Sequence, residues 1–253
     1  MIDTTDSILL NALNARSGIV SVVGAGGKKT TLYRLLAIHP GRVGLSATSF
    51  TYTFPRDLPA EVHVAPLEQL LVEVPASPAQ RIAYALPSDK KGRLGGLEAA
   101  DVLTIHRSGG FDLTLLKADG ARMRRIKCPA EHEPQIPDCA DTVLLVLSVA
   151  AVGRPLDDRV AHRPERVSEV TGLKLGDTIQ PRHLGRIYSH PLGLLKGTGE
   201  RHVVPVVHMV DGPEQEEAAR QVAAHALAGS QRFDRVVLTS TRRDSYLVDI
   251  IRR

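Results

Sequence analysis

A glycine-rich segment followed by lysines and threonines is the part of this sequence best suited to chemistry. It reads Gly24-Ala-Gly-Gly-Lys-Lys-Thr-Thr31. The backbone amides of such a loop and the N-terminus of the next helix carry partial positive charge, a lysine neutralises phosphate oxygens, and a hydroxyl ligates Mg²⁺. The segment therefore predicts nucleotide binding through Gly24, Ala25, Gly26, Gly27, Lys28, Lys29, Thr30 and Thr31.

The spacing of this segment leaves two assignments for the phosphate lysine. The usual pattern has two glycines four residues apart, then Lys, then Ser or Thr. Here the glycines are closer together and two lysines precede the first threonine. If Lys29 neutralises the phosphates, Thr30 takes the place of the metal-binding hydroxyl. We favour this pair and keep Lys28 as the alternative, and a glycine turn that binds nothing is the plain structural explanation.

An acidic residue at the end of an apolar segment is the second candidate for chemistry. Residues 111–120 predict a strand that ends in Ala-Asp-Gly, with Asp119 at its tip. An acid in this place holds Mg²⁺ beside the phosphate loop of many NTPases. We therefore predict Lys29 and Asp119 as catalytic residues, and Thr30 and Asp119 as Mg²⁺ ligands. An ordinary Asp-Gly turn is the simpler alternative.

The elements that position these residues are predicted to be alternating strands and helices. Hydrophobic periodicity predicts strands over residues 19–23, 42–50, 61–64, 142–149, 203–211, 234–240 and 246–251. It predicts helices over 7–15, 28–38, 67–72, 97–106, 181–189 and 214–228. This alternation predicts an α/β fold with a three-layer, mostly parallel sheet of the P-loop NTPase type. We expect one domain over residues 1–253, with a small lid or substrate-binding insertion at about 150–200.

The composition argues for a globular protein and against a nucleic-acid-binding, secreted or membrane protein. An apolar fraction of 43% and a charged fraction of 24% are ordinary for a globular protein. The net charge of +4 is mild and there is no Trp, so we expect no nucleic-acid partner. The first residues, Met1–Asp6, lack the basic start and apolar core of a signal peptide. We therefore expect a cytoplasmic protein with no membrane partner, and Cys128 and Cys139 are expected to be unreactive.

Three blocks of sequence occur in order: residues 24–35, residues 117–122 (Lys-Ala-Asp-Gly-Ala-Arg) and residues 127–137 (Lys-Cys-Pro-Ala-Glu-His-Glu-Pro-Gln-Ile-Pro). Together they resemble the accessory proteins of selenium-dependent molybdenum hydroxylases, the YqeC-like family. Residues 152–156, 162–165 and 189–197 are similar to that family too. The basic run over residues 121–127 is most simply a solvated surface, with an anion clamp as the alternative.

The resemblance implies a P-loop-like protein that helps prepare or insert the selenium-containing cofactor of molybdenum hydroxylases. It also implies that the glycine segment contacts the nucleotide and that the Asp119 carboxylate binds Mg²⁺. Glu131, His132 and Glu133 belong to the family signature without an assigned role. Because neighbours on an extended chain point to opposite sides, we do not predict one metal bound by all three.

Asp211 is a further candidate for nucleotide contact. The strand over residues 203–211 corresponds to the one that ends in Asn-Lys-x-Asp in GTPases, where the acid binds guanine. Here His208 and Met209 replace the Asn and Lys, whereas Asp211 remains. ATP and GTP therefore both stay open as the nucleotide.

The sequence as a whole predicts a Mg²⁺-dependent, nucleoside-triphosphate-binding accessory protein that hydrolyses ATP or GTP. Its expected partners are the nucleotide and an apo molybdenum hydroxylase or a cofactor intermediate. One alternative is an ATP-dependent ligase or kinase that acts on a small acid. Another is a non-enzymatic module that delivers a cofactor under control of the nucleotide.

Overall fold

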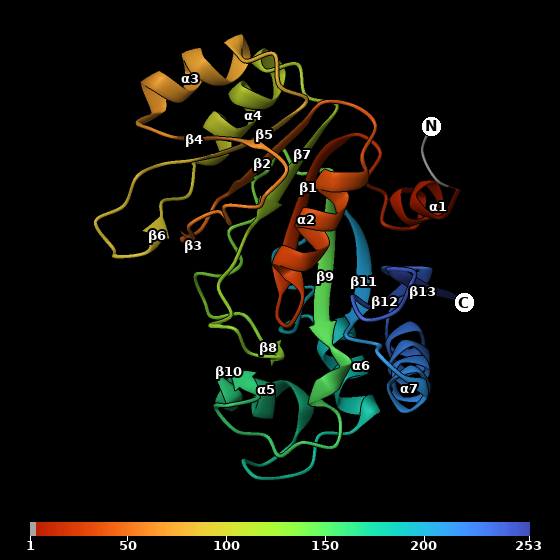
Figure 1. Ribbon diagram of the computed structural model, residues 1–253. Coiled ribbons are helices and arrows are strands. Elements are labelled where there is room, and N and C mark those ends of the chain that lie inside the picture. The colour runs from red at the N-terminus through yellow and green to blue at the C-terminus, as the bar shows by residue number, and fades with distance from the viewer. Residues whose placement is uncertain (1–3) are drawn as a thin grey trace. The chain divides into compact units, whose positions relative to one another are not determined.

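The strands of the protein belong to one α/β architecture. The computed structural model describes residues 4–253, so the first three residues of the N-terminal stretch lie outside it. The strands follow the order β13-β12-β11-β9-β1-β7-β2-β5-β4 in a nine-stranded, mostly parallel sheet, with helices on both faces (Figure 1). The predicted α/β class and three-layer architecture are confirmed, and they are consistent with a P-loop NTPase-like fold.

The chain divides into two compact units. Unit 1 consists of Met1–Val22, Lys29–Gly120 and Gln135–Thr142. Its elements are α1 (Thr4–Ala12), β1 (Gly18–Gly24), α2 (Lys28–Ile38), β2 (Val43–Ala47), β3 (Thr51–Tyr52), β4 (Glu61–Val64), α3 (Leu67–Ala76), β5 (Arg81–Ala85), β6 (Arg93–Leu94), α4 (Ala99–Ser108) and β7 (Leu113–Lys117), with β1 and α2 crossing its boundaries.

Parallel pairing organises unit 1. The neighbouring pairs β1–β7, β7–β2, β2–β5 and β5–β4 are all parallel. The carboxyl ends of these strands therefore share one edge, where ligands bind in open α/β sheets. The core of the unit packs α3 and α4 against the sheet through Leu70, Val74, Val102 and Ile105, all fully buried.

Unit 2 consists of Val23–Lys28, Ala121–Pro134 and Val143–Arg253. Its elements are β8 (Ile126–Lys127), β9 (Thr142–Ser148), the 3₁₀ turn η1 (Val149–Ala151), β10 (Ala161–His162), α5 (Pro164–Thr171), α6 (Pro181–Ser189), β11 (His202–His208), α7 (Pro213–Gly229), β12 (Arg235–Thr239) and β13 (Leu247–Arg252), with the first residue of β9 in unit 1. The predicted insertion at about 150–200 corresponds to η1, β10, α5 and α6. A lid or substrate-binding role for this region stays a prediction, as does the single domain.

A buried tyrosine ties the elements of unit 2 together. Tyr188 on α6 donates its hydroxyl to the carbonyl of Val206 at 2.7 Å and accepts a hydrogen bond from the Leu147 amide at 3.1 Å. One side chain therefore joins α6 to β9 and β11. The final pair, β12 and β13, is antiparallel. Among residues 4–253, no helix combines the length and apolar composition needed to cross a bilayer.

Candidate nucleotide site

The glycine segment connects the end of β1 to the start of α2. Gly24 has φ +101°, a left-handed value that favours glycine, and a Cβ there would collide with the carbonyl of Val146 on β9. The Ala25 amide donates to that same carbonyl at 2.8 Å. Backbone contacts therefore fix the first half of the loop to β9. The Ala25 amide is already used in this hydrogen bond.

The second half of the loop approaches the ends of other segments of unit 2. A Cβ on Gly26 would lie 2.5 Å from the Ser148 Cβ and 2.7 Å from the Arg125 carbonyl oxygen. A Cβ on Gly27 would lie 2.5 Å from Cδ2 of His208. Within residues 4–253 the Gly26 amide makes no hydrogen bond, so it is available to a bound anion. These contacts explain why three glycines are needed here.

The two lysines of the segment have different surroundings. Lys28, the first residue of α2, is buried and donates from Nζ back to the carbonyl of Gly24. Its ammonium therefore lies across the loop. Lys29 instead lies with Nζ 4.9 Å from the centre of the Tyr52 ring, and burial, followed by the charge of Arg93, lowers its pKa. The assignment of the phosphate lysine to Lys29, with Lys28 as the alternative, stays a prediction.

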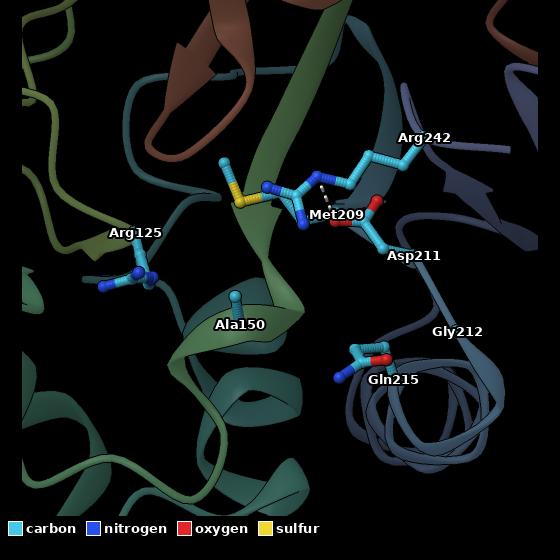
Figure 2. Close-up of a pocket in the computed structure, with 7 residues that line it drawn as sticks. All are labelled: Arg125, Ala150, Met209, Asp211, Gly212, Gln215 and Arg242. Carbon is cyan, nitrogen blue, oxygen red and sulfur yellow. Dashed lines mark ion pairs between the residues drawn. The ribbon is translucent and has the colours of Figure 1, made fainter.

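A pocket of about 350 Å³ lies in the same unit as the loop. Loop and pocket share neighbours, since Ser148 contacts Gly26, donates its amide to the Arg125 carbonyl at 3.0 Å and donates its hydroxyl to Sδ of Met209 at 3.0 Å. Figure 2 shows the seven residues that line the pocket: Arg125, Ala150, Met209, Asp211, Gly212, Gln215 and Arg242.

The electrostatics of this pocket suit an anionic ligand with polar groups. Arg125 and Arg242 supply positive charge, and the N-terminus of α7 begins just after Gly212. Asp211 accepts a hydrogen bond from the Ser240 hydroxyl at 2.7 Å and lies 3.7 Å from Nε of Arg242. The carboxylate is therefore held in place at the pocket wall, between β11 and α7.

The structure distributes the predicted site residues over the two units. The three glycines, Ala25, Lys28 and Asp211 belong to unit 2, where the loop and the pocket adjoin. The remaining predicted residues belong to unit 1. There Thr30 is half-buried in the first turn of α2, Thr31 is fully buried, and Asp119 is buried just beyond β7.

Comparison with known proteins identifies the family. A model of the YqeC protein family matches residues 20–165, which is more than half of the chain. The chain belongs to the YqeC family. It is 27% identical over 209 residues to the uncharacterized protein YqeC of Escherichia coli strain K12, covering 78% of this chain and 77% of that protein. The predicted resemblance to the YqeC-like family is therefore confirmed.

The family match includes a buried ion cluster. The Glu133 carboxylate lies 2.8 Å from Nζ of Lys127 and 2.6 Å from Nη1 of Arg163. The Lys127 side chain is fully buried and that of Glu133 is 11% exposed. Burial raises the pKa of Glu133, but the charge of Lys127 and hydrogen bonds from Lys127, the Ala130 amide and Arg163 outweigh it and hold that pKa below its ordinary value. Glu133 thus joins three segments of the unit.

The two residues before Glu133 in the family signature lie at the surface. Glu131 and His132 are exposed, and Glu131 makes a 3.3 Å surface ion pair with Arg166. In the described part of the chain, no three His, Cys, Asp or Glu side chains gather closely enough to hold a metal ion. Burial raises the pKa of the Cys128 thiol to about 12, so this thiol is protonated at neutral pH.

His208, which packs against the loop, makes the stability of the protein depend on pH. Its Nδ1 lies 2.9 Å from the Thr239 hydroxyl, and burial lowers its pKa to about 4. Below about pH 6.5 the His208 ring is protonated in the unfolded chain but stays neutral in the folded protein. The free energy of unfolding therefore falls by about 3 kcal/mol as the pH drops from about 6.5 to 4. Above pH 6.5 the group has no effect.

Urea unfolding from pH 7 to 4 measures this dependence. We expect His208→Asn to reduce the proton uptake on unfolding near pH 5.5 by about one. The matched variant His132→Asn changes an exposed ring and should leave the profile as in the wild type. An unchanged profile in His208→Asn would show that the ring titrates normally in the folded protein.

Proposed function

We propose that the protein is a nucleoside-triphosphate-binding accessory factor for maturation of selenium-dependent molybdenum hydroxylases. The observation that carries nucleotide binding is the glycine loop of unit 2, which the Lys28 ammonium crosses and which adjoins a pocket with two arginines. Amides, a helix start and a lysine at one place supply the fixed positive charge that phosphates require. The role in hydroxylase maturation rests on the family resemblance.

The proposal includes Mg²⁺, held by Thr30 and Asp119. A hydroxyl in the first turn of a helix and a buried carboxylate after a strand are oxygen ligands of the kind that this ion prefers. When bound, Mg²⁺ would neutralise charge on the β- and γ-phosphates. Within unit 2, Lys28 would stabilise negative charge on a phosphate, and the Gly26 amide would donate a hydrogen bond to it. Hydrolysis of ATP or GTP is the proposed reaction.

Calorimetric titration of ATP and GTP with Mg²⁺ tests the proposal. We expect micromolar binding to the wild type and at least about a tenfold loss in Lys28→Ala, equal to about 1.4 kcal/mol. Lys29→Ala is the matched control, because it also removes one lysine charge, at the next residue in the sequence. In the wild type the Lys29 ammonium lies against the Tyr52 ring. We expect a smaller loss there.

The affinities of the two variants decide between the assignments of the phosphate lysine. A larger loss in Lys29→Ala would restore the assignment favoured by the sequence pattern, and normal affinity in both variants would refute phosphate binding by the loop. Phosphate release measured under the same conditions separates hydrolysis from binding alone. Nucleotide-dependent co-purification with an apo molybdenum hydroxylase tests the accessory role.

A further inference from the structure

Unit 1 has a cavity of its own at the carboxyl edge of its strands. The volume is about 390 Å³, within the range of small-molecule sites. Its walls come from the loops that follow β2 and β5 and from the turn after β6. The lining residues are Thr48, Ser49, Phe50, Leu86, Pro87, Ser88, Asp89, Gly95, Gly96 and Gln135, all within unit 1.

Hydrogen bonds fix the polar wall of this cavity. The Thr48 hydroxyl donates to the Gln135 carbonyl at 2.5 Å. Lys117, a buried lysine at the end of β7, donates from Nζ to the Ser49 hydroxyl at 2.9 Å and to the Phe50 carbonyl at 2.7 Å. The loop after β2 is therefore held in one shape before any ligand binds, which lowers the entropic cost of binding.

Aromatic rings and cations lie together at Phe50, which lines the cavity, and at the β3–β6 pair, which is next to lining residues in the sequence. Phe50 is 49% exposed and the Lys90 ammonium lies 3.7 Å from the centre of its ring. Tyr52 on β3 is opposite Arg93 on β6, and the Arg93 guanidinium lies 3.5 Å from the centre of the Tyr52 ring. Lys29 lies against that ring too. Exposed rings accept stacked planar molecules, and three cations attract an anion.

We propose that this cavity is a second ligand site, which takes a phosphorylated planar heterocycle. The heterocycle would stack on Phe50, the hydroxyls of Ser49 and Ser88 would meet its polar edge, and Lys90 and Arg93 would neutralise its phosphate. One acid, Asp89, belongs to the lining and can accept a hydrogen bond from a ring N–H. The proposal stands whether or not the glycine loop binds a nucleotide.

A single-tryptophan reporter tests the site directly. Because the chain has no Trp, Phe50→Trp introduces a single tryptophan at the cavity, which is excited selectively over the five tyrosines at wavelengths on the order of 300 nm, and keeps a flat ring there. The probes are flavin mononucleotide, its uncharged counterpart riboflavin, and inorganic phosphate. We expect saturable quenching by flavin mononucleotide in the micromolar range and at least tenfold weaker quenching by riboflavin. We expect inorganic phosphate to compete only at millimolar concentration.

Substitutions in the reporter background locate the binding. Lys90→Ala with Arg93→Ala is expected to weaken the affinity for flavin mononucleotide at least tenfold. Arg107→Ala, which removes an exposed cation from the last turn of α4, is the matched control and should change it less than twofold. Lys28→Ala should leave this affinity unchanged, which separates the cavity from the glycine loop.

Three results would overturn the proposal. They are no saturable quenching, unchanged affinity in the double variant, and loss of quenching in Lys28→Ala with retention in the double variant. The last result would assign the probe to the glycine loop and support nucleotide binding there instead. Circular dichroism of each variant establishes that it is folded, and the substituted residues other than Lys28 are exposed or partly exposed.

Discussion

Replacing Glu133 by glutamine is expected to destabilise the protein by about 3–5 kcal/mol, because the buried Lys127 loses its 2.8 Å counter-charge. Removing one partner of a buried ion pair costs the desolvation of the charge left behind, and the Arg163 guanidinium loses its 2.6 Å partner in the same step. Urea unfolding at pH 7 measures the loss. We expect the wild-type contribution of this carboxylate to be complete above about pH 4.5 and to be lost as pH falls through its lowered pKa.

The same short segment offers a matched control. Glu131 is two residues away, its side chain is 91% exposed, and its ion pair with Arg166 is at the surface. Glu131→Gln should therefore cost less than about 1 kcal/mol. Adding Lys127→Met to Glu133→Gln should recover part of the loss, because the double variant no longer buries the lysine charge. Equal losses in Glu131→Gln and Glu133→Gln would show that burial of the cluster does not matter.

Strong periodic signals made most elements predictable. The predicted bounds of β4 and α6 agree with the structure, and those of β1, α2, β9 and α7 agree within one residue at each end. β5 was not predicted, because its five residues Arg81–Ala85 lie between prolines and carry no clear period. Only its pairing with β2 and β4 makes it a strand. Tertiary contact, rather than local preference, decides such short segments.

α5 was missed for a different reason. It buries only Val167 and Val170, too few apolar residues to show a helical stripe. Its N-cap, Arg163, adopts the left-handed conformation with φ +61°, which sequence rules assign to Gly, Asn or Asp. The Glu133 carboxylate bonds that arginine, so a contact 30 residues away accompanies the unusual start of this helix.

The candidate site was predictable in part. Glycines next to lysine and threonine identify a loop from local sequence alone, and the contacts of Gly24, Gly26 and Gly27 give each glycine a steric reason. The pocket beside the loop was not predictable, because Arg125 and Arg242 come from distant parts of the chain. The sequence favours a solvated surface for the basic run over residues 121–127. That interpretation is wrong for Lys127, which is fully buried against Glu133.

Replacing Gly24 by alanine is the other change with a large expected effect. The residue has φ +101°, and a Cβ would collide with the Val146 carbonyl, a backbone atom that cannot move without shifting β9. We expect a loss of stability of at least about 2–3 kcal/mol, from backbone strain and overpacking together. If the proposed function holds, nucleotide affinity should fall as well, since the displaced loop no longer presents its amides or the Lys28 ammonium.

Gly153→Ala separates the two causes of this loss. Gly153 also lies in unit 2 and has φ +79°, but a Cβ there would have no atom within 4 Å. Its substitution should therefore cost only the left-handed conformation, about 1 kcal/mol. The difference between the two variants in urea unfolding measures the close approach of the loop to β9. Because that approach shapes the loop, equal losses would mean that Gly24 is required for its backbone angle alone, and that β9 does not position the loop.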